Sequence, residues 1–313
     1  MARIAYLGPE GTFTEAALRQ ITAAGLVPGQ GGGVEPLPVD STSAALDAVR
    51  DGAADYACVP IENSIDGSVT PTLDSLAIGS PLQVFAETTL DVVFSIVVKP
   101  GRSAADVRTL AAFGVAAAQV RQWVAANLAD AELRPAYSNA DAAQQVAEGH
   151  ADAAVTSPLA ATRWGLDTLA EGVVDESNAR TRFLLVGRPG PPPARTGADR
   201  TSVVLRIDNA PGALLAALAE FGVRGIDLTR IESRPTRTGL GTYRFFADCV
   251  GHIDDDAVAE ALKALHRRCA DVRYLGSWPT GSPAGALPPA ADEGARWLAQ
   301  LRDGKPDERG SQG

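Results

Sequence analysis

The sequence predicts an α/β domain built from two similar lobes, followed by a smaller α+β domain of the ferredoxin-like type. Three observations lead to this fold class. Short apolar runs alternate with helical patterns over residues 1–188, which is typical of α/β folds. One helix–glycine–strand pattern occurs twice in that segment, and residues 201–278 have the element order β-α-β-β-α-β, which is the split βαβ unit.

The first elements are a short strand at Ile4–Leu7 and a helix at Phe13–Ala24. Thr12 followed by Glu15 is a capping-box pattern at the start of this helix, and Gly25 is placed to end it. The chain therefore begins with a strand, a glycine-containing turn and a capped helix.

The repeated pattern follows. Ser41–Gly52 contains a helix at Ser43–Arg50 and leads to a strand at Asp55–Val59, while Ser138–Gly149 leads to a strand after Asp152, 97 residues further on. We interpret the repeat as two similar α/β lobes with a cleft between them, which is a natural place for a small ligand. Chance similarity in an alanine-rich sequence is the alternative.

Composition divides the rest of the chain. The Pro/Gly-rich stretch that runs from Gly187 predicts a linker at 189–200. Residues 201–278 form the second domain, and 279–313 predict a flexible tail with room for a short helix at 295–301. In the second domain we expect strands and helices at Ser202–Ile207, Ala213–Phe221, Ile226–Ser233, Thr242–Val250, a helix that starts near Asp254–Asp256, and Val272–Leu275.

Charge and length restrict the partners. The net charge of −10 argues against general affinity for nucleic acid or an anionic membrane. The longest strongly apolar run, Val92–Val98, is far too short to span a bilayer, and the apolar stretch at the N-terminus is too short for a signal peptide. We therefore expect a cytoplasmic protein.

Cysteine and histidine usage does not predict a metal site. Cys58, Cys249 and Cys269 are widely spaced, there is no CxxC, and the three histidines form neither HxxxH nor HExxH. We expect reduced core cysteines and no metal site.

Three polar segments next to predicted strands are candidate binding sites. Gly8–Glu15 forms a turn before a helix N-terminus, where backbone N–H groups bind anions, although it matches neither GxGxxG nor a Walker loop. Pro60–Val69 gathers hydrogen-bonding side chains after a strand, and Glu176–Phe183 places two arginines around one threonine. Plain turns and a solvated polar loop are the alternatives. In the second domain, Gly212–Leu215 and Glu232–Pro235 stand out, with an ordinary helix start and strand end as alternatives.

Together these segments resemble the monofunctional prephenate dehydratases that carry a C-terminal ACT regulatory domain. The resemblance rests on Tyr6–Thr14, Pro60–Gly67 and Asn178–Phe183, and in the second domain on Gly212–Leu215 and Glu232–Pro235. It implies a two-lobed catalytic domain similar to type 2 periplasmic binding proteins. It also implies conversion of prephenate to phenylpyruvate, carbon dioxide and water, without a cofactor.

The resemblance also implies roles for individual residues. Catalytic roles fall to Thr181, Asn63 and Arg182, with Thr181 assisting hydroxyl departure by a hydrogen bond. Substrate binding falls to Gly11, Thr12, Glu62, Ser64, Gln119 and Phe183. Phenylalanine, as allosteric effector on a homodimer or homotetramer, would be bound by Gly212, Ala213, Leu214, Glu232, Ser233 and Arg234.

One position departs from the family pattern. Many members carry Ser-His-Pro-Gln, but Ala112 stands here at the serine position, while the later Gln119 remains. This puts any role of that serine in doubt. It also leaves room for a competing function, a two-lobed aromatic-acid sensor without catalysis. A second competing function is the same chemistry on arogenate.

Overall fold

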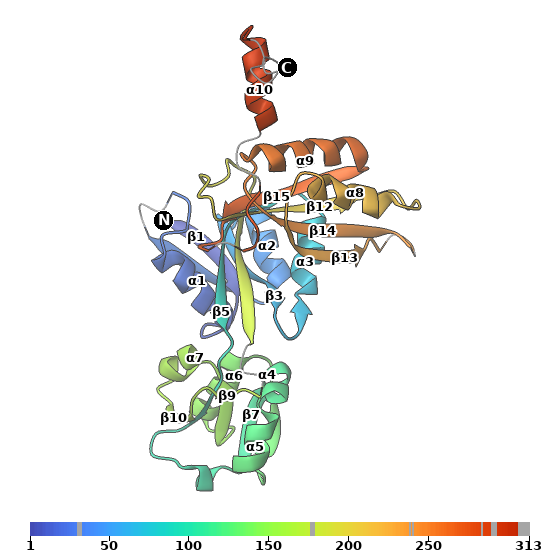
Figure 1. Cartoon of the computed structure of the whole chain (residues 1–313). Coiled ribbons are helices and arrows are strands. Elements are labelled where there is room, and N and C mark those ends of the chain that lie inside the picture. The colour runs from blue at the N-terminus through green and yellow to red at the C-terminus, as the bar shows by residue number, and fades with distance from the viewer. Residues whose placement is uncertain are drawn as a thin grey trace. The chain divides into compact units, whose positions relative to one another are not determined.

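The computed structural model describes residues 1–29, 33–175, 179–237, 239, 241–282, 284–288 and 293–305. The chain divides into two compact units, Met1–Pro189 and Gly190–Gly313, each described below by itself. The first unit contains two α/β lobes, which Figure 1 shows with their helices and strands. No helix in the described ranges is both long and apolar enough to cross a membrane.

The first lobe is a mixed sheet in the order β2-β1-β3-β11-β5, with β4 paired to β3. Its strands are β1 (Ala2–Leu7), β2 (Val34–Val39), β3 (Tyr56–Asn63), β4 (Gly67–Ser68), β5 (Gln83–Asp91) and β11 (Arg180–Gly187). β1 runs parallel to β2 and β3, and β11 is antiparallel to β3 and β5. The last strand of the unit is thus inserted between two strands from its first half.

Helices α1 (Phe13–Ala23), α2 (Thr42–Arg50) and α3 (Thr70–Ala77) pack on this sheet. The apolar face of α1, which includes Leu18 and Ile21, is buried with Tyr6 and Cys58 in one hydrophobic cluster. Burial raises the pKa of the Cys58 thiol, so this cysteine is an inert core residue.

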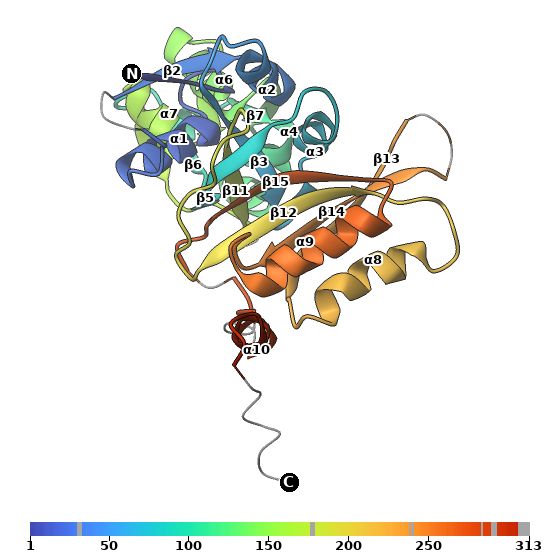
Figure 2. The same ribbon diagram turned by 90° about the horizontal axis from the view of Figure 1, so that it is seen from above.

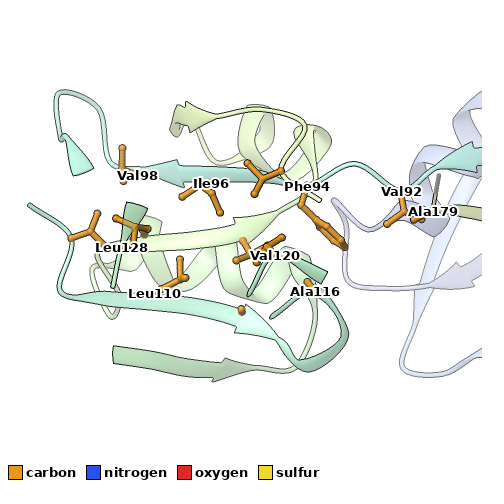
Figure 3. Packing of buried hydrophobic residues seen from close by; sticks show 14 residues of the cluster. Val92, Phe94, Ile96, Val98, Leu110, Ala116, Val120, Leu128 and Ala179 are labelled. Carbon is orange, nitrogen blue, oxygen red and sulfur yellow. The ribbon is translucent and has the colours of Figure 1, made fainter. Parts of the chain in front are cut away.

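The second lobe is a mixed sheet in the order β10-β6-β9-β7-β8. Its elements are β6 (Ser95–Val98), η1 (Ala104–Asp106), β7 (Thr109–Phe113), α4 (Gly114–Gln119), α5 (Arg121–Asn127), β8 (Glu132–Ala136), α6 (Asn139–Glu148), β9 (Ala153–Thr156), α7 (Pro158–Arg163) and β10 (Asp167–Ala170). Figure 3 shows its core, in which Ile96, Leu110, Val120 and Leu128 pack together.

The predicted internal repeat is confirmed. Ser41 caps α2 and Ser138 caps α6, each by accepting a hydrogen bond from a backbone N–H in the first turn. Gly52 and Gly149 follow the two helices with φ of 76° and 83°, a left-handed conformation that glycine adopts at low cost. β3 and β9 come next, so each lobe contains the same helix–glycine–strand unit.

Two segments connect the lobes. Val92–Phe94 leads from β5 to β6, and the chain returns toward β11 after Val173. The N–H of Val92 donates to the carbonyl of Ala179 at 2.7 Å, so the crossing segments are paired where they meet the first lobe. Figure 3 shows Val92 and Ala179 next to each other at this end of the second-lobe core.

The second unit has the predicted β-α-β-β-α-β order. Its elements are β12 (Asp199–Arg206), α8 (Ala213–Gly222), β13 (Leu228–Pro235), β14 (Tyr243–Val250), α9 (Asp256–Arg268) and β15 (Asp271–Pro279). The sheet is antiparallel in the order β13-β14-β12-β15, and α8 and α9 lie side by side on one face of it (Figure 2). This is the expected ferredoxin-like fold.

The segment predicted as a linker is held to the second unit by specific contacts. Arg195 forms an ion pair with Asp255, and the carbonyl of Pro193 lies 3.0 Å from Nε2 of His252. The Asp199 carboxylate accepts hydrogen bonds from the preceding loop, and β12 already begins at this residue. The C-terminal part of the predicted linker, residues 193–199, therefore makes side-chain and backbone contacts within the second unit.

The predicted tail also begins with contacts. The N–H of Ala286 donates to the Asp227 carboxylate at 3.0 Å. Further on, α10 (Glu293–Arg302) contains the short helix expected at 295–301.

Candidate active site

One edge of the first-lobe sheet gathers most of the predicted site residues. β1 and β3 run parallel and β11 is antiparallel to β3. The carboxyl ends of β1 and β3 and the start of β11 therefore lie at the same edge, which is where ligands bind in open α/β sheets. The Gly8–Thr12 turn, Asn63 and Thr181 meet there.

Asn63 and Thr181 form the best-defined pair of this edge. They face each other across the β3–β11 ladder, and Nδ2 of Asn63 donates to Oγ1 of Thr181 at 2.9 Å. Oδ1 of Asn63 accepts from the N–H groups of Ile65 and Asp66 at 2.8 and 3.0 Å, which fixes the orientation of the amide. Within the described residues the Thr181 hydroxyl accepts this hydrogen bond and donates none.

The segment around Asn63 is more regular than the sequence suggested. The sequence predicts a strand that ends at Val59, with Pro60–Asn63 after it, but β3 continues to Asn63. Pairing explains the difference, because β11 covers one side of this end and β4 covers the other. Ser64 comes next, and its Oγ accepts from the N–H of Arg180 at 2.9 Å.

Arg182 is held by carboxylates. Its guanidinium lies 3.2 Å from Oε2 of Glu87 and 3.1 Å from Oε2 of Glu62. The side chains of Arg182 and Glu87 are 9% and 7% exposed, so this is a buried ion pair. Successive side chains of a strand point to opposite faces, so Arg182 does not share the face of Thr181.

Two predicted substrate residues are occupied by structural contacts. Phe183 is 2% exposed and belongs to the hydrophobic cluster under α1. The hydroxyl of Thr12 accepts from the N–H of Glu15 at 3.3 Å and donates to the carbonyl of Leu7 at 3.0 Å. We therefore assign Phe183 to packing and the hydroxyl of Thr12 to helix capping.

The capping box forms only in part. Glu15 does not return to the N–H of Thr12; its Oε2 accepts from the N–H of Gly11 at 2.5 Å instead. Oε1 of Glu15 binds Arg19 of the same helix and Arg163 of the second lobe. The Gly11 N–H, one of the groups expected to bind an anion, is thus already satisfied by a carboxylate.

Gln119 lies in the second lobe, at the end of α4. Its side chain is buried, and in the part of the chain that the structure describes Oε1 has no hydrogen-bond partner. Its carbonyl accepts from the N–H of Asp175 at 2.6 Å, which ties α4 to the segment that returns to the first lobe. A buried polar atom without a partner is rare in proteins and marks a candidate ligand contact.

The predicted effector residues come from two segments that end at one side of the second-unit sheet. β12 and β13 are both antiparallel to β14, so they run in the same direction. The start of α8 after β12 and the end of β13 therefore lie at the same side. Gly212 has φ of 78° directly before Ala213 and Leu214 of α8, and Glu232, Ser233 and Arg234 end β13.

Sequence analysis missed three residues at the edges of the lobes. Glu87, Ser157 and Arg163 belong to none of the three polar segments that the sequence analysis selects. Their partners lie far away in the sequence, so no local pattern could reveal them. Glu176, Ser177 and Asn178, which belong to a predicted motif, lie outside the described residues.

Among the described residues no group of three or more His, Cys, Asp or Glu side chains is placed to hold a metal ion. The fold is a unit of two α/β lobes with polar side chains gathered at one end of the first-lobe sheet, followed by a ferredoxin-like unit. Residues 4–191 match the family Prephenate dehydratase, and residues 201–267 match the ACT domain. The chain belongs to the prephenate dehydratase family.

Individual relatives agree with this assignment. A prephenate dehydratase from Mycobacterium avium (strain 104) is 89% identical over 311 residues, covering 99% of both chains. The crystal structure of prephenate dehydratase from Arthrobacter aurescens in complex with L-Phe is 41% identical, with a TM-score of 0.85 over 96% of this chain and 98% of that one. The predicted family and fold class are thus confirmed.

A third relative has a different name. The quorum-quenching acylase GqqA is 30% identical, with a TM-score of 0.77 over 88% of this chain and 97% of that one. One fold can host unrelated activities, so the roles of single residues in this chain depend on the contacts of its own site.

Proposed function

We propose that the protein converts prephenate to phenylpyruvate, carbon dioxide and water, as a step of phenylalanine biosynthesis. The observation that carries the proposal is the pair of Asn63 and Thr181, joined at 2.9 Å with the amide orientation fixed by two backbone donors. Formation of phenylpyruvate from prephenate by the purified chain tests it, and binding without product would contradict it.

The chemistry requires little more than orientation and one hydrogen bond. Prephenate carries two carboxylates and a ring hydroxyl, and the loss of carbon dioxide and hydroxide together creates an aromatic ring. The driving force lies in the substrate, so positioning and preorganised electrostatics are the main tasks of the protein. Thr181 keeps its proton and donates a hydrogen bond to the departing oxygen, which leaves as hydroxide and is protonated to water by solvent, and Asn63 holds Thr181 in the orientation that makes this possible.

The other residues of the edge support this pair. We assign Arg182 as a positioning residue, because its charge is paired with Glu87 and Glu62. Ser64 connects the end of β3 to the backbone of Arg180. Gln119 is proposed to contact the substrate from the second lobe, since its side-chain oxygen is buried and unpartnered among the described residues.

Regulation is assigned to the second unit. We infer that phenylalanine binds where Gly212–Leu214 and Glu232–Arg234 end at the same side of the sheet. The L-Phe complex of the Arthrobacter aurescens relative supports an effector of this kind. A homodimer or homotetramer and a cytoplasmic location remain predictions, as does feedback inhibition as the outcome.

Glu232→Ala should weaken phenylalanine binding about 10–100-fold, the range expected for the loss of one charge-assisted hydrogen bond. Isothermal calorimetry on the full chain measures this. Glu260→Ala is the matched control, because Glu260 is an exposed carboxylate of the same unit paired with Lys263 on α9. Unchanged affinity in Glu232→Ala would remove this residue from the effector site.

Two other functions remain as alternatives. Arogenate differs from prephenate by an amino group in place of a keto oxygen. An aromatic-acid sensor would bind the substrate with the same edge but release no product. Rates on both substrates separate all three functions.

A further inference from the structure

The short segment Glu10–Glu15 carries a dense set of contacts between the two lobes of the first unit. Phe13 packs edge-on against Phe94 of the second lobe, with ring centroids 5.7 Å apart. Ser157 Oγ donates to the carbonyl of Gly11 at 2.8 Å. Arg163 forms ion pairs with Glu10 and with Glu15. One loop of the first lobe is thus attached to both ends of α7.

Close packing adds to these polar contacts. A Cβ on Gly11 would lie 3.2 Å from Cβ of Ala160 on α7 and 3.5 Å from Cβ of Ala140 on α6. Gly11 also has φ of 94°, which side-chain-bearing residues rarely adopt. Glycine is required here both by the backbone conformation and by the approach of the second lobe.

Glu15 is the centre of the polar contacts. Its side chain is 6% exposed, and it is neutralised by Arg19 from its own lobe and Arg163 from the other. It also accepts the Gly11 N–H at 2.5 Å. Burial, followed by the Glu15 charge, raises the pKa of the neighbouring Tyr6 to about 12, although Arg163 and Arg19 act in the opposite direction. A carboxylate this buried depends strongly on its cations.

We propose that Glu15 and Arg163 are positioning residues for the substrate site, because together they clamp the Gly11–Thr14 loop of the first lobe onto α7 of the second lobe. The inference rests on the proposed function, since this loop lies at the same sheet edge as Asn63 and Thr181. The clamp holds one wall of the site at a fixed position before substrate arrives. Such preorganisation lowers the cost of binding.

The kinetic signature follows from the population of the clamped state. If only a fraction of molecules has the loop in place, the apparent affinity falls by that fraction. We expect Arg163→Met to raise KM for prephenate about tenfold and to change kcat less than about twofold, because the residues that touch the reacting atoms are unaltered.

A second readout does not depend on activity. The Gly11 N–H is hydrogen-bonded to Glu15, so its exchange with solvent reports on the clamp. We expect hydrogen exchange of the peptide that contains Gly11 to be about tenfold faster in Arg163→Met. Arg3→Met is the matched control, since Arg3 forms an exposed ion pair with Glu35 inside the first lobe; both readouts should stay at wild-type values.

Arg163→Lys separates charge from geometry. Lysine keeps the positive charge but lacks the planar fork that reaches two carboxylates, so we expect a KM between those of the wild type and Arg163→Met. A KM within about twofold of the wild type in Arg163→Met, or unchanged exchange, would contradict the clamp. If Arg163→Met does not fold, exchange and KM of Arg163→Lys decide in its place. If the wild type has no activity on prephenate, the proposed function fails, while exchange still decides whether the clamp exists.

Discussion

Thr181→Val should lower kcat for prephenate by about 10²–10³-fold, the usual cost of removing one positioned hydrogen-bond donor to an oxygen on which negative charge develops. Valine keeps the shape of the side chain and its β-branch, so β11 should remain intact. It removes the hydroxyl that accepts from Asn63 Nδ2 and has its own hydrogen available for the departing oxygen. The measurement is phenylpyruvate formation under saturating prephenate.

Thr181→Ser is the matched control, because it retains the hydroxyl and loses only a methyl group. We expect its kcat to stay within about tenfold of the wild type, since serine keeps the donor but gains rotamer freedom. If Thr181→Val and the wild type have the same kcat, Thr181 does not assist hydroxyl departure and the assigned mechanism is wrong.

Arg182→Leu should destabilise the first lobe by about 3–5 kcal/mol, the usual cost of removing one partner from a buried ion pair. The Glu87 side chain is 7% exposed and would lose the cation that lies 3.2 Å from it. Hydrogen exchange of the β5 and β11 amides measures the effect locally and therefore does not depend on the second unit.

Arg180→Leu provides the comparison on the same strand. Arg180 pairs with Asp91 at 2.8 Å, but both side chains are more than half exposed. Such pairs contribute about 0–1 kcal/mol, so the exchange of the same amides should change little. Equal destabilisation by the two substitutions would show that burial of the Glu87 pair is not what stabilises this end of the sheet.

Much of the architecture could be predicted from local patterns. The repeated helix–glycine–strand pattern is visible in the sequence. In the structure Ser41 and Ser138 cap the two helices, and Gly52 and Gly149 follow them. These signals lie within a few residues of the structure they determine, because caps and glycine stops act through the adjacent backbone. The same holds for the β-α-β-β-α-β order of the second unit.

The end of β3 shows where local patterns stop being informative. Pro60–Asn63 contains a proline and polar residues, so the sequence places it after the strand and leaves a plain turn as the alternative. It is a strand because β11, more than a hundred residues later, pairs with it. Pairing over such a distance has no local signal in a single sequence.

The candidate site follows the same division. Asn63 and Thr181 lie in two different motifs of the sequence. The family resemblance was enough to predict both as catalytic residues, and the structure joins them by a hydrogen bond. The face of the sheet to which each side chain points was not predictable. Thr181 and Arg182 are adjacent in one motif, yet Thr181 contacts Asn63 while Arg182 pairs with Glu87. Glu15 fits a capping box in sequence, but in the structure its carboxylate accepts hydrogen bonds from the distant Arg163 and from the N–H of Gly11.

The central claim is that this chain removes carbon dioxide and hydroxide from prephenate. The most direct measurement mixes the purified full chain with prephenate and, separately, with arogenate, and follows carbon dioxide together with the aromatic product. We predict equal amounts of carbon dioxide and phenylpyruvate from prephenate, at a kcat/KM above that for arogenate. Tight binding of prephenate without release of carbon dioxide would contradict the claim and identify the protein as a sensor. A higher kcat/KM for arogenate than for prephenate would identify arogenate as the preferred substrate.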